Sequence, residues 1–107
     1  MKVRLHEEAV IEAEEAARWY SQQQRGLGKE FTQELKRCLR SLRANPTRLP
    51  LLETAPPNMK VRRALTARFP YKIIFEIIQN EVVVLAVAHG SRRPDYWIKR
   101  RQRPGSV

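Results

Sequence analysis

With 107 residues, the chain has the size of a single domain and leaves no room for a second catalytic domain. Its 42% of hydrophobic and 30% of charged residues are typical of a folded globular protein rather than of a disordered one. The longest apolar run, residues 82–88, is too short to span a bilayer, and the first residues contain no apolar signal core. We therefore expect a cytoplasmic protein without membrane contact.

The net charge of +10 is concentrated in the second half of the chain. Residues 1–57 contain ten Lys/Arg and eight Asp/Glu, whereas residues 58–107 contain eleven and three. Arginine predominates, and its planar guanidinium group suits phosphate or carboxylate. This distribution predicts a polyanionic partner, either nucleic acid or an acidic protein segment. The alternative is a charged surface that only maintains solubility.

The first half of the chain predicts a short strand followed by two helices. Val3 and Leu5 alternate with charged residues, which is typical of a strand. Apolar residues recur at steps of three and four over residues 7–24, and glutamates at the start of this segment favour a helix N-terminus. A second helix begins near residue 27 and ends at Asn45-Pro46. Its apolar stripe consists of Leu27, Phe31, Leu35, Cys38, Leu39 and Leu42.

The sequence Gly26-Leu27-Gly28 interrupts the helical pattern between these two segments. Helices joined by so short a connection form an antiparallel hairpin. Cys38 is the only cysteine, so no intrachain disulfide can form, and its place in the apolar stripe predicts a buried structural thiol.

A proline-rich loop at residues 46–59 separates the helices from a region of β structure. In residues 61–68 the apolar positions share one strand face with Arg63, while Arg62 and Arg68 lie on the other face. The segment therefore predicts the first strand after the loop.

The remaining chain predicts a β-hairpin and a short C-terminal helix. Residues 71–78 are rich in β-forming side chains, and residues 79–81 form a plausible turn. The near-continuous apolar run of residues 82–89 is typical of a central strand covered on both faces. A short helix is expected at residues 95–101 and a frayed tail at residues 103–107.

The predicted order is β-α-α-β-β-β, which places the chain in the α+β class. We expect the helical hairpin to pack on one face of a small antiparallel sheet. The opposite face would then carry the basic residues and the C-terminal segment.

An ordered set of motifs in this chain resembles the RelE/ParE toxin superfamily, and its ParE-like branch in particular. The motifs are Trp19-Tyr20, Gly26-Leu27-Gly28, Phe31, RRAL at residues 62–65, RFPYK at residues 68–72, VVVLAVAH at residues 82–89 and RRPDYW at residues 92–97. The resemblance covers nearly the whole chain and implies one toxin domain over residues 1–107. Its fold, a helical hairpin on an antiparallel sheet, agrees with the elements predicted above.

The resemblance implies a small cytoplasmic growth inhibitor of a type II toxin–antitoxin system, of the kind associated with plasmid stabilisation. A cognate antitoxin encoded beside it would neutralise it. RelE-like members cleave messenger RNA, usually on the ribosome, and ParE-like members are described as inhibitors of DNA gyrase. The fold alone does not choose between these targets.

A ribonuclease of this superfamily would act without a metal. It needs a base for the 2′-hydroxyl, cations for the phosphorane and an acid for the leaving oxygen. His89 is the candidate base and Tyr96 the candidate acid or stacking platform, although both could have structural roles. The candidate cations are Arg63, Lys72, Arg92 and Arg93.

The ribonuclease pattern is incomplete in this chain. RelE-like ribonucleases carry two spaced lysines on the corresponding strand. Arg63 matches the first of these lysines, but apolar Leu65 lies near the position of the second. Lys72 stands where an arginine is usual, Arg92 or Arg93 matches the later arginine, and the family's C-terminal tyrosine is matched only approximately. These departures favour gyrase as the target.

Arg62, Arg68 and Trp97 are the candidate residues for binding the target or the antitoxin. The antitoxin segment should be acidic or amphipathic and fold as it wraps the basic face and the helical hairpin. No cofactor and no metal are expected. Alternative interpretations are a nucleic-acid-binding module without enzymatic activity and a decayed toxin that retains only antitoxin binding.

Overall fold

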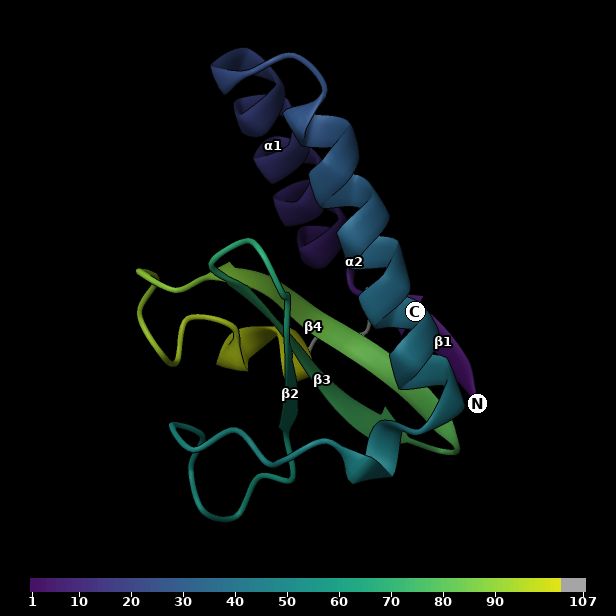
Figure 1. The fold of residues 1–107 in the computed structure, drawn as a ribbon. Helices are drawn as coiled ribbons and strands as arrows, with labels where there is room; N and C mark the ends of the chain where they lie inside the picture. Colours follow the sequence, from purple (N-terminus) through teal and green to yellow (C-terminus); the bar gives the residue numbers. More distant parts are fainter. Residues whose placement is uncertain (103–107) are drawn as a thin grey trace.

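The computed structural model describes residues 1–102, and its elements follow the predicted order (Figure 1). The predicted tail at residues 103–107 lies outside the described residues. The predicted helical hairpin, the predicted strands and the α+β arrangement are confirmed. The elements are β1 (Lys2–Leu5), α1 (Glu7–Gln23), α2 (Leu27–Ala44), β2 (Arg62–Leu65), β3 (Tyr71–Ile78) and β4 (Glu81–His89), with 3₁₀ helices at Pro46–Arg48 and Ile98–Gln102.

The sheet has the strand order β1-β4-β3-β2, so the last strand lies at the centre beside the first. β2, β3 and β4 pair antiparallel, whereas β1 pairs parallel with β4. The predicted turn between β3 and β4 consists of Gln79 and Asn80, both at positive φ (48° and 67°), which matches the right-handed twist of a two-residue hairpin. The parallel edge strand is the one departure from a purely antiparallel sheet.

Both helices lie on the same face of the sheet, with α1 closest to β4 (Figure 1). Gly26 begins the second helix with a φ of 82°, a conformation that glycine adopts without strain. Gly28 lies in close contact with the first helix. A Cβ atom added there would lie 2.0 Å from Ser21 Oγ and 2.3 Å from the carbonyl oxygen of Ala17.

We expect Gly28→Ala to destabilise the hairpin although alanine has the higher helix propensity. The added methyl group overlaps the Ala17 backbone, so the helices must separate, at a cost of about 1–3 kcal/mol. Urea denaturation followed by circular dichroism measures the change. Combining the change with Ser21→Ala should restore little stability because the backbone overlap remains, and Lys29→Ala, at an exposed position on the same helix, is the control. An unchanged or increased midpoint for Gly28→Ala would contradict this prediction.

β4 contains a β-bulge at Leu85. Phe75 pairs with Val84 and Ile74 with Ala86, so Leu85 has no partner on β3. Since side chains alternate along a strand, one extra residue exchanges the faces on which the following side chains lie. Val84 therefore contacts the helices, and Leu85 and Ala86 both contact the opposite core.

The sheet is thus buried between two apolar cores. The helix-side core contains an aromatic cluster of Tyr20, Phe31, Phe69 and Tyr71, whose ring centroids lie 4.8–6.3 Å apart. Cys38 packs at its margin as a half-buried thiol, less enclosed than predicted, and burial raises its pKa. The second core lies on the other face and consists of Leu52, Val61, Ile74, Val83, Leu85, Ala86, Ala88 and Trp97.

Two element boundaries differ from the prediction. β2 ends at Leu65 because Thr66 already closes a turn, with its hydroxyl and amide donating to backbone carbonyls of Phe69 and Tyr71. Arg68 therefore lies in a bend and not on a strand face. The C-terminal helix is a 3₁₀ helix that begins at Ile98, because the preceding segment forms turns that place Trp97 in the second core.

Candidate functional site

The structure places the candidate base and two candidate cations on opposite faces of the sheet. Directly paired residues share a face, and Lys72 pairs with Leu65 and Ala88, which assigns it to the face away from the helices. Arg63 pairs with Ile74 and lies on that same face. His89 pairs with Tyr71 on the helix side, where the two rings meet edge to face at 5.2 Å.

Arg63 is engaged by a glutamate of the proline-rich loop. Its guanidinium group donates to both carboxylate oxygens of Glu53, at 2.8 and 3.3 Å. This hydrogen bonding to Arg63 is the main cause that lowers the pKa of Glu53 to about 2, and the nearby charge of Lys72 contributes. The positive charge expected at Arg63 is therefore largely neutralised within the chain.

His89 lies at the end of β4 and is half-buried. Its Nδ1 atom lies 2.7 Å from Ser91 Oγ and accepts a hydrogen bond from the Ser91 amide at 3.0 Å. The ring is thus held by the loop that follows the strand, which is the structural role weighed for it above.

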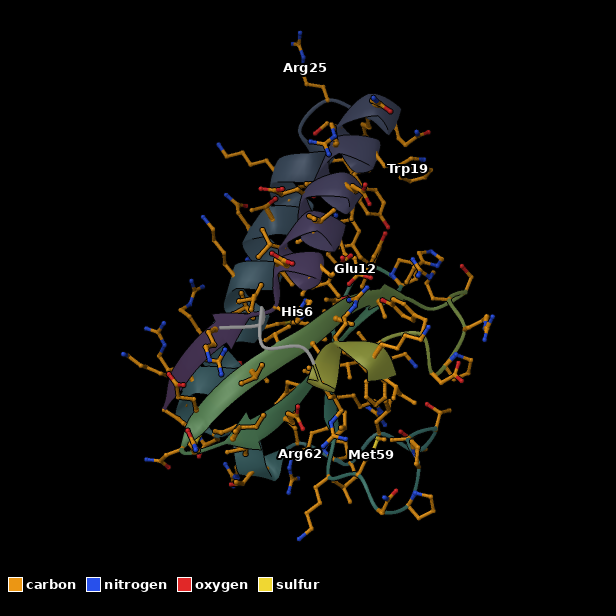
Figure 2. The ribbon with its side chains drawn as sticks, turned by 180° about the vertical axis from the view of Figure 1, so that it is seen from behind. His6, Glu12, Trp19, Arg25, Met59 and Arg62 are labelled. Atoms are coloured by element: carbon orange, nitrogen blue, oxygen red, sulfur yellow. The ribbon has the colours of Figure 1, made fainter. Side chains whose placement is uncertain are left out.

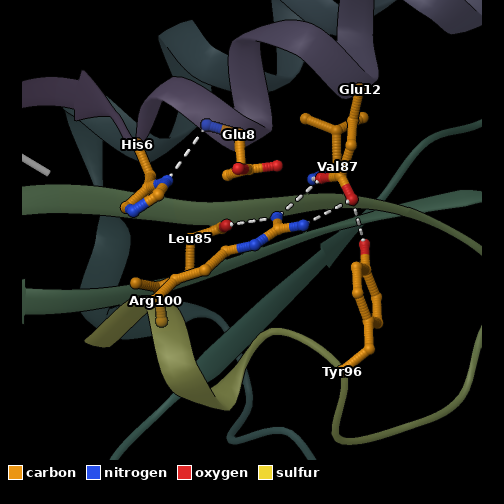
Figure 3. A network of polar contacts seen from close by, with 7 residues as sticks. All are labelled: His6, Glu8, Glu12, Leu85, Val87, Tyr96 and Arg100. Carbon is orange, nitrogen blue, oxygen red and sulfur yellow. Dashed lines mark hydrogen bonds and ion pairs between the residues drawn. The ribbon is translucent and has the colours of Figure 1, made fainter. Parts of the chain in front are cut away.

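Tyr96 belongs to a buried polar network that joins α1 to the C-terminal segment (Figure 3). Its hydroxyl donates to Glu12 Oε2 at 2.6 Å, and the same carboxylate forms two contacts of 2.9 and 3.1 Å with Arg100. The Val87 amide also donates to Glu12, and Arg100 donates to the carbonyl of Leu85. Burial, followed by the hydrogen bond to Glu12, raises the pKa of Tyr96 well above the usual value, so this hydroxyl is a poor proton donor.

This network forms hydrogen bonds to the backbone of β4 beyond the point where its pairing with β1 ends. β1 pairs with β4 only as far as Val84, and the bulge then turns the Leu85 carbonyl toward the C-terminal segment. Side chains of Glu12 and Arg100 satisfy backbone groups that a longer β1 would have paired. The sequence analysis missed both residues. The one feature of the sequence that could have indicated the network is the carboxylate of Glu12, which lies beside the apolar stripe of the first helix.

Arg92, Arg93 and Lys99 surround a cavity of about 500 Å³ that also contacts Asp95, Tyr96 and Ile98. The guanidinium carbon of Arg92 lies 3.9 Å above the centre of the Tyr96 ring, a favourable cation–π geometry. Arg93 lies 4.0 Å from Asp95, and its side chain is 85% exposed. This cavity, defined here as the basic cleft, brings together three of the predicted site residues: Arg92, Arg93 and Tyr96.

The other predicted binding residues have structural partners. Arg62 donates to the carbonyls of Thr47 and Leu49, and Arg68 forms an ion pair of 2.7 Å with Glu30. Trp97 is completely buried, and its Nε1–H donates to the Pro94 carbonyl. The expectation that Trp97 contacts a partner directly is therefore corrected: its side chain fills the second core.

Among residues 1–102, no group of three or more His, Cys, Asp or Glu residues could hold a metal ion. No helix in this described part of the chain is long and apolar enough to cross a membrane.

Comparison with known proteins gives one family and one similar solved structure. The model of the family described as "ParE toxin of type II toxin-antitoxin system, parDE" matches residues 3–94. The chain is also similar to a chain of the chromosomal ParDE TA system from P. aeruginosa, with a TM-score of 0.70, 15% identity and coverage of 83% of this chain and 95% of that one. No curated protein matches the sequence. The match to residues 3–94 contains Glu12 but ends before Tyr96 and Arg100.

Proposed function

Because the chain belongs to the ParE toxin family of type II toxin–antitoxin systems, we propose that it arrests bacterial growth by inhibiting DNA gyrase. We further propose that residues 1–107 form one cytoplasmic toxin domain and that a cognate antitoxin, encoded beside it, neutralises the toxin. The toxin identity follows from the family match over residues 3–94. The target, the location and the details of neutralisation are the proposed parts.

The separation of the ribonuclease candidates carries the choice of gyrase over RNA. A metal-free nuclease needs its base and its cations around one phosphate. In this chain His89 lies on the helix side of the sheet, whereas Arg63 and Lys72 lie on the other. The Tyr96 hydroxyl donates a hydrogen bond to Glu12, and its raised pKa means that it keeps its proton. His89 and Tyr96 line one cavity with Arg92, but Glu12 engages the Tyr96 hydroxyl, and neither Arg63 nor Lys72 lines this cavity. The full set of base, acid and cations therefore does not form one site.

The proposed antitoxin contact includes the exposed surface of α1. Three large apolar side chains are exposed there: Val10 at 38%, Ile11 at 46% and Trp19 at 56%. Exposed apolar residues on one helix suit an amphipathic partner segment that folds on binding. An acidic segment would also be attracted by the positively charged second half of the chain.

Induced expression of the chain in bacteria should stop growth, and co-expression of the adjacent small reading frame should restore it. The purified protein should reduce plasmid supercoiling by gyrase, while messenger RNA isolated during arrest stays intact. His89→Ala should keep both effects. In a ribonuclease the loss of a general base would lower cleavage by about 100-fold or more. Cleaved transcripts that disappear in the His89→Ala variant would refute the gyrase proposal, and normal growth at verified soluble expression would refute the toxin itself.

A further inference from the structure

Ion pairs within the chain neutralise much of the charge in its second half, and three of the cations that they leave lie around the basic cleft. Four arginines are paired with carboxylates: Arg63 with Glu53, Arg68 with Glu30, Arg100 with Glu12 and Arg101 with Glu76. By contrast, neither the guanidinium group of Arg92 nor the ammonium group of Lys99 has a hydrogen-bond acceptor or an ion-pair partner within residues 1–102. Arg93 has only the 4.0 Å contact with Asp95. All three line the basic cleft.

The basic cleft is rigidly built on one side. The Tyr96 ring is held by the hydrogen bond of its hydroxyl to Glu12 and by the contact with Arg100. The guanidinium group of Arg92 stacks on the same ring. Stacking restricts the guanidinium group and leaves its N–H groups at the edge of the plane, where they can donate to an anion. The entropic cost of ordering Arg92 on binding is therefore reduced before any ligand arrives.

A second cavity of about 250 Å³ adjoins the basic cleft and shares Arg92 and Tyr96 with it. Its wall includes Trp19, which is 56% exposed and projects from α1 on the side of the loop at residues 90–97 (Figure 2). His89 also lines this cavity. An exposed indole beside unpaired cations is the arrangement that binds a base and its phosphate together.

We propose that this continuous surface binds single-stranded nucleic acid, with phosphates at Arg92, Arg93 and Lys99 and a base stacked on Trp19. The basic cleft contains three cations against the single carboxylate of Asp95, whereas the Trp19 end contains the exposed carboxylate of Glu15. This difference in charge assigns the phosphates to the basic cleft. A purely acidic segment such as polyglutamate would satisfy the cations but has no ring to stack on the exposed indole of Trp19. This site goes beyond gyrase inhibition and is independent of it.

The test is fluorescence anisotropy of the full chain with a labelled 12-nucleotide DNA strand, the same sequence as RNA, and the DNA duplex. Three phosphate contacts predict that log K falls against log salt with a slope of about −2 for single strands. The variant R92A/R93A/K99A should bind at least about tenfold more weakly at low salt, with a slope near zero. R18A/R25A/K29A, which removes the same charge from exposed positions of the helical hairpin, should bind within about twofold of the unchanged chain.

A separate variant tests the stacking contact. W19A should weaken single-strand binding by about fivefold or more without changing the salt slope, and W19F should retain part of the affinity. The proposal is overturned if both triple variants lose affinity equally, if duplex binds as well as single strands with no effect of W19A, or if polyglutamate competes as well as an oligonucleotide. Whichever of the DNA and RNA strands binds with the higher affinity identifies the type of nucleic acid that the site prefers. Growth arrest and gyrase inhibition are measured separately, so a failure of this site leaves the proposed function standing.

Discussion

Replacing Glu12 by alanine should lower the free energy of unfolding by about 3–5 kcal/mol, because it leaves the enclosed Arg100 charge without its partner. The side chains of Glu12 and Arg100 are only 13% and 12% exposed. The change also removes the acceptor for the Tyr96 hydroxyl and the Val87 amide. A loss of this size is a large part of the stability of a domain, which is about 5–15 kcal/mol.

Thermal unfolding of the full chain measures this effect, and the midpoint should fall by more than about 10 °C. Glu15→Ala is the matched control, since Glu15 is an exposed carboxylate on the same helix and its loss should cost about 0.5 kcal/mol or less. Glu12→Gln should fall between the two because it keeps an oxygen acceptor but not the charge. Equal midpoints for the Glu12→Ala and Glu15→Ala variants would show that the network contributes nothing.

Trp97→Ala should cost about 3–5 kcal/mol, since it leaves a large cavity in the second core. The indole is completely buried, and its N–H is satisfied by the Pro94 carbonyl. Trp97→Phe keeps most of the apolar contact and should cost less. The loss should be visible in denaturant midpoints before any partner is added, which separates a core residue from a binding residue.

The chain has two tryptophans, so the burial of Trp97 can be measured by fluorescence of single-tryptophan variants. In Trp19→Phe the remaining emission comes from buried Trp97 and should shift to longer wavelength only on unfolding. In Trp97→Phe the emission comes from Trp19, which is 56% exposed in the folded chain. If the Trp97→Ala variant kept its full stability and lost only antitoxin binding, the assignment of Trp97 to the core would be wrong.

Local patterns were sufficient to predict most of the fold. The apolar stripe from Leu27 to Leu42 and the stop at Asn45-Pro46 gave the second helix, because helical periodicity and proline geometry act over a few residues. The β3–β4 hairpin could be predicted from β-forming residues on either side of Gln79 and Asn80. Their positive φ angles then match the twist of the strands.

Contacts between distant residues could not be predicted in the same way. The partner of Glu12 is 88 residues away, and no periodicity connects positions 12 and 100. The bulge at Leu85 lies within an unbroken apolar run, so alternation gave no sign that the faces exchange there. Trp97 follows charged and turn-forming residues, which suggested a surface position, although the chain turns back and buries it.

In the candidate site too, the sequence indicates the charge content but not which charged residues pair with each other. Arginine content predicted a basic surface, but the sequence could not tell that Glu53 engages Arg63, or that Arg92 stacks on Tyr96 and forms no ion pair within residues 1–102. Each pairing depends on where a loop places one carboxylate. These pairings leave the net charge of +10 unchanged, but they decide on which part of the surface it lies.

The parallel pairing of β1 with β4 has a consequence for folding during synthesis. β1 and both helices leave the ribosome well before residues 81–89, which supply the strand that β1 and α1 contact. Until then the helical hairpin has no sheet to cover, and contacts so far apart in sequence form slowly. The nascent chain thus remains without its central strand until most of the sequence has been translated, and the face of the helical hairpin that packs on β4 stays uncovered during that interval.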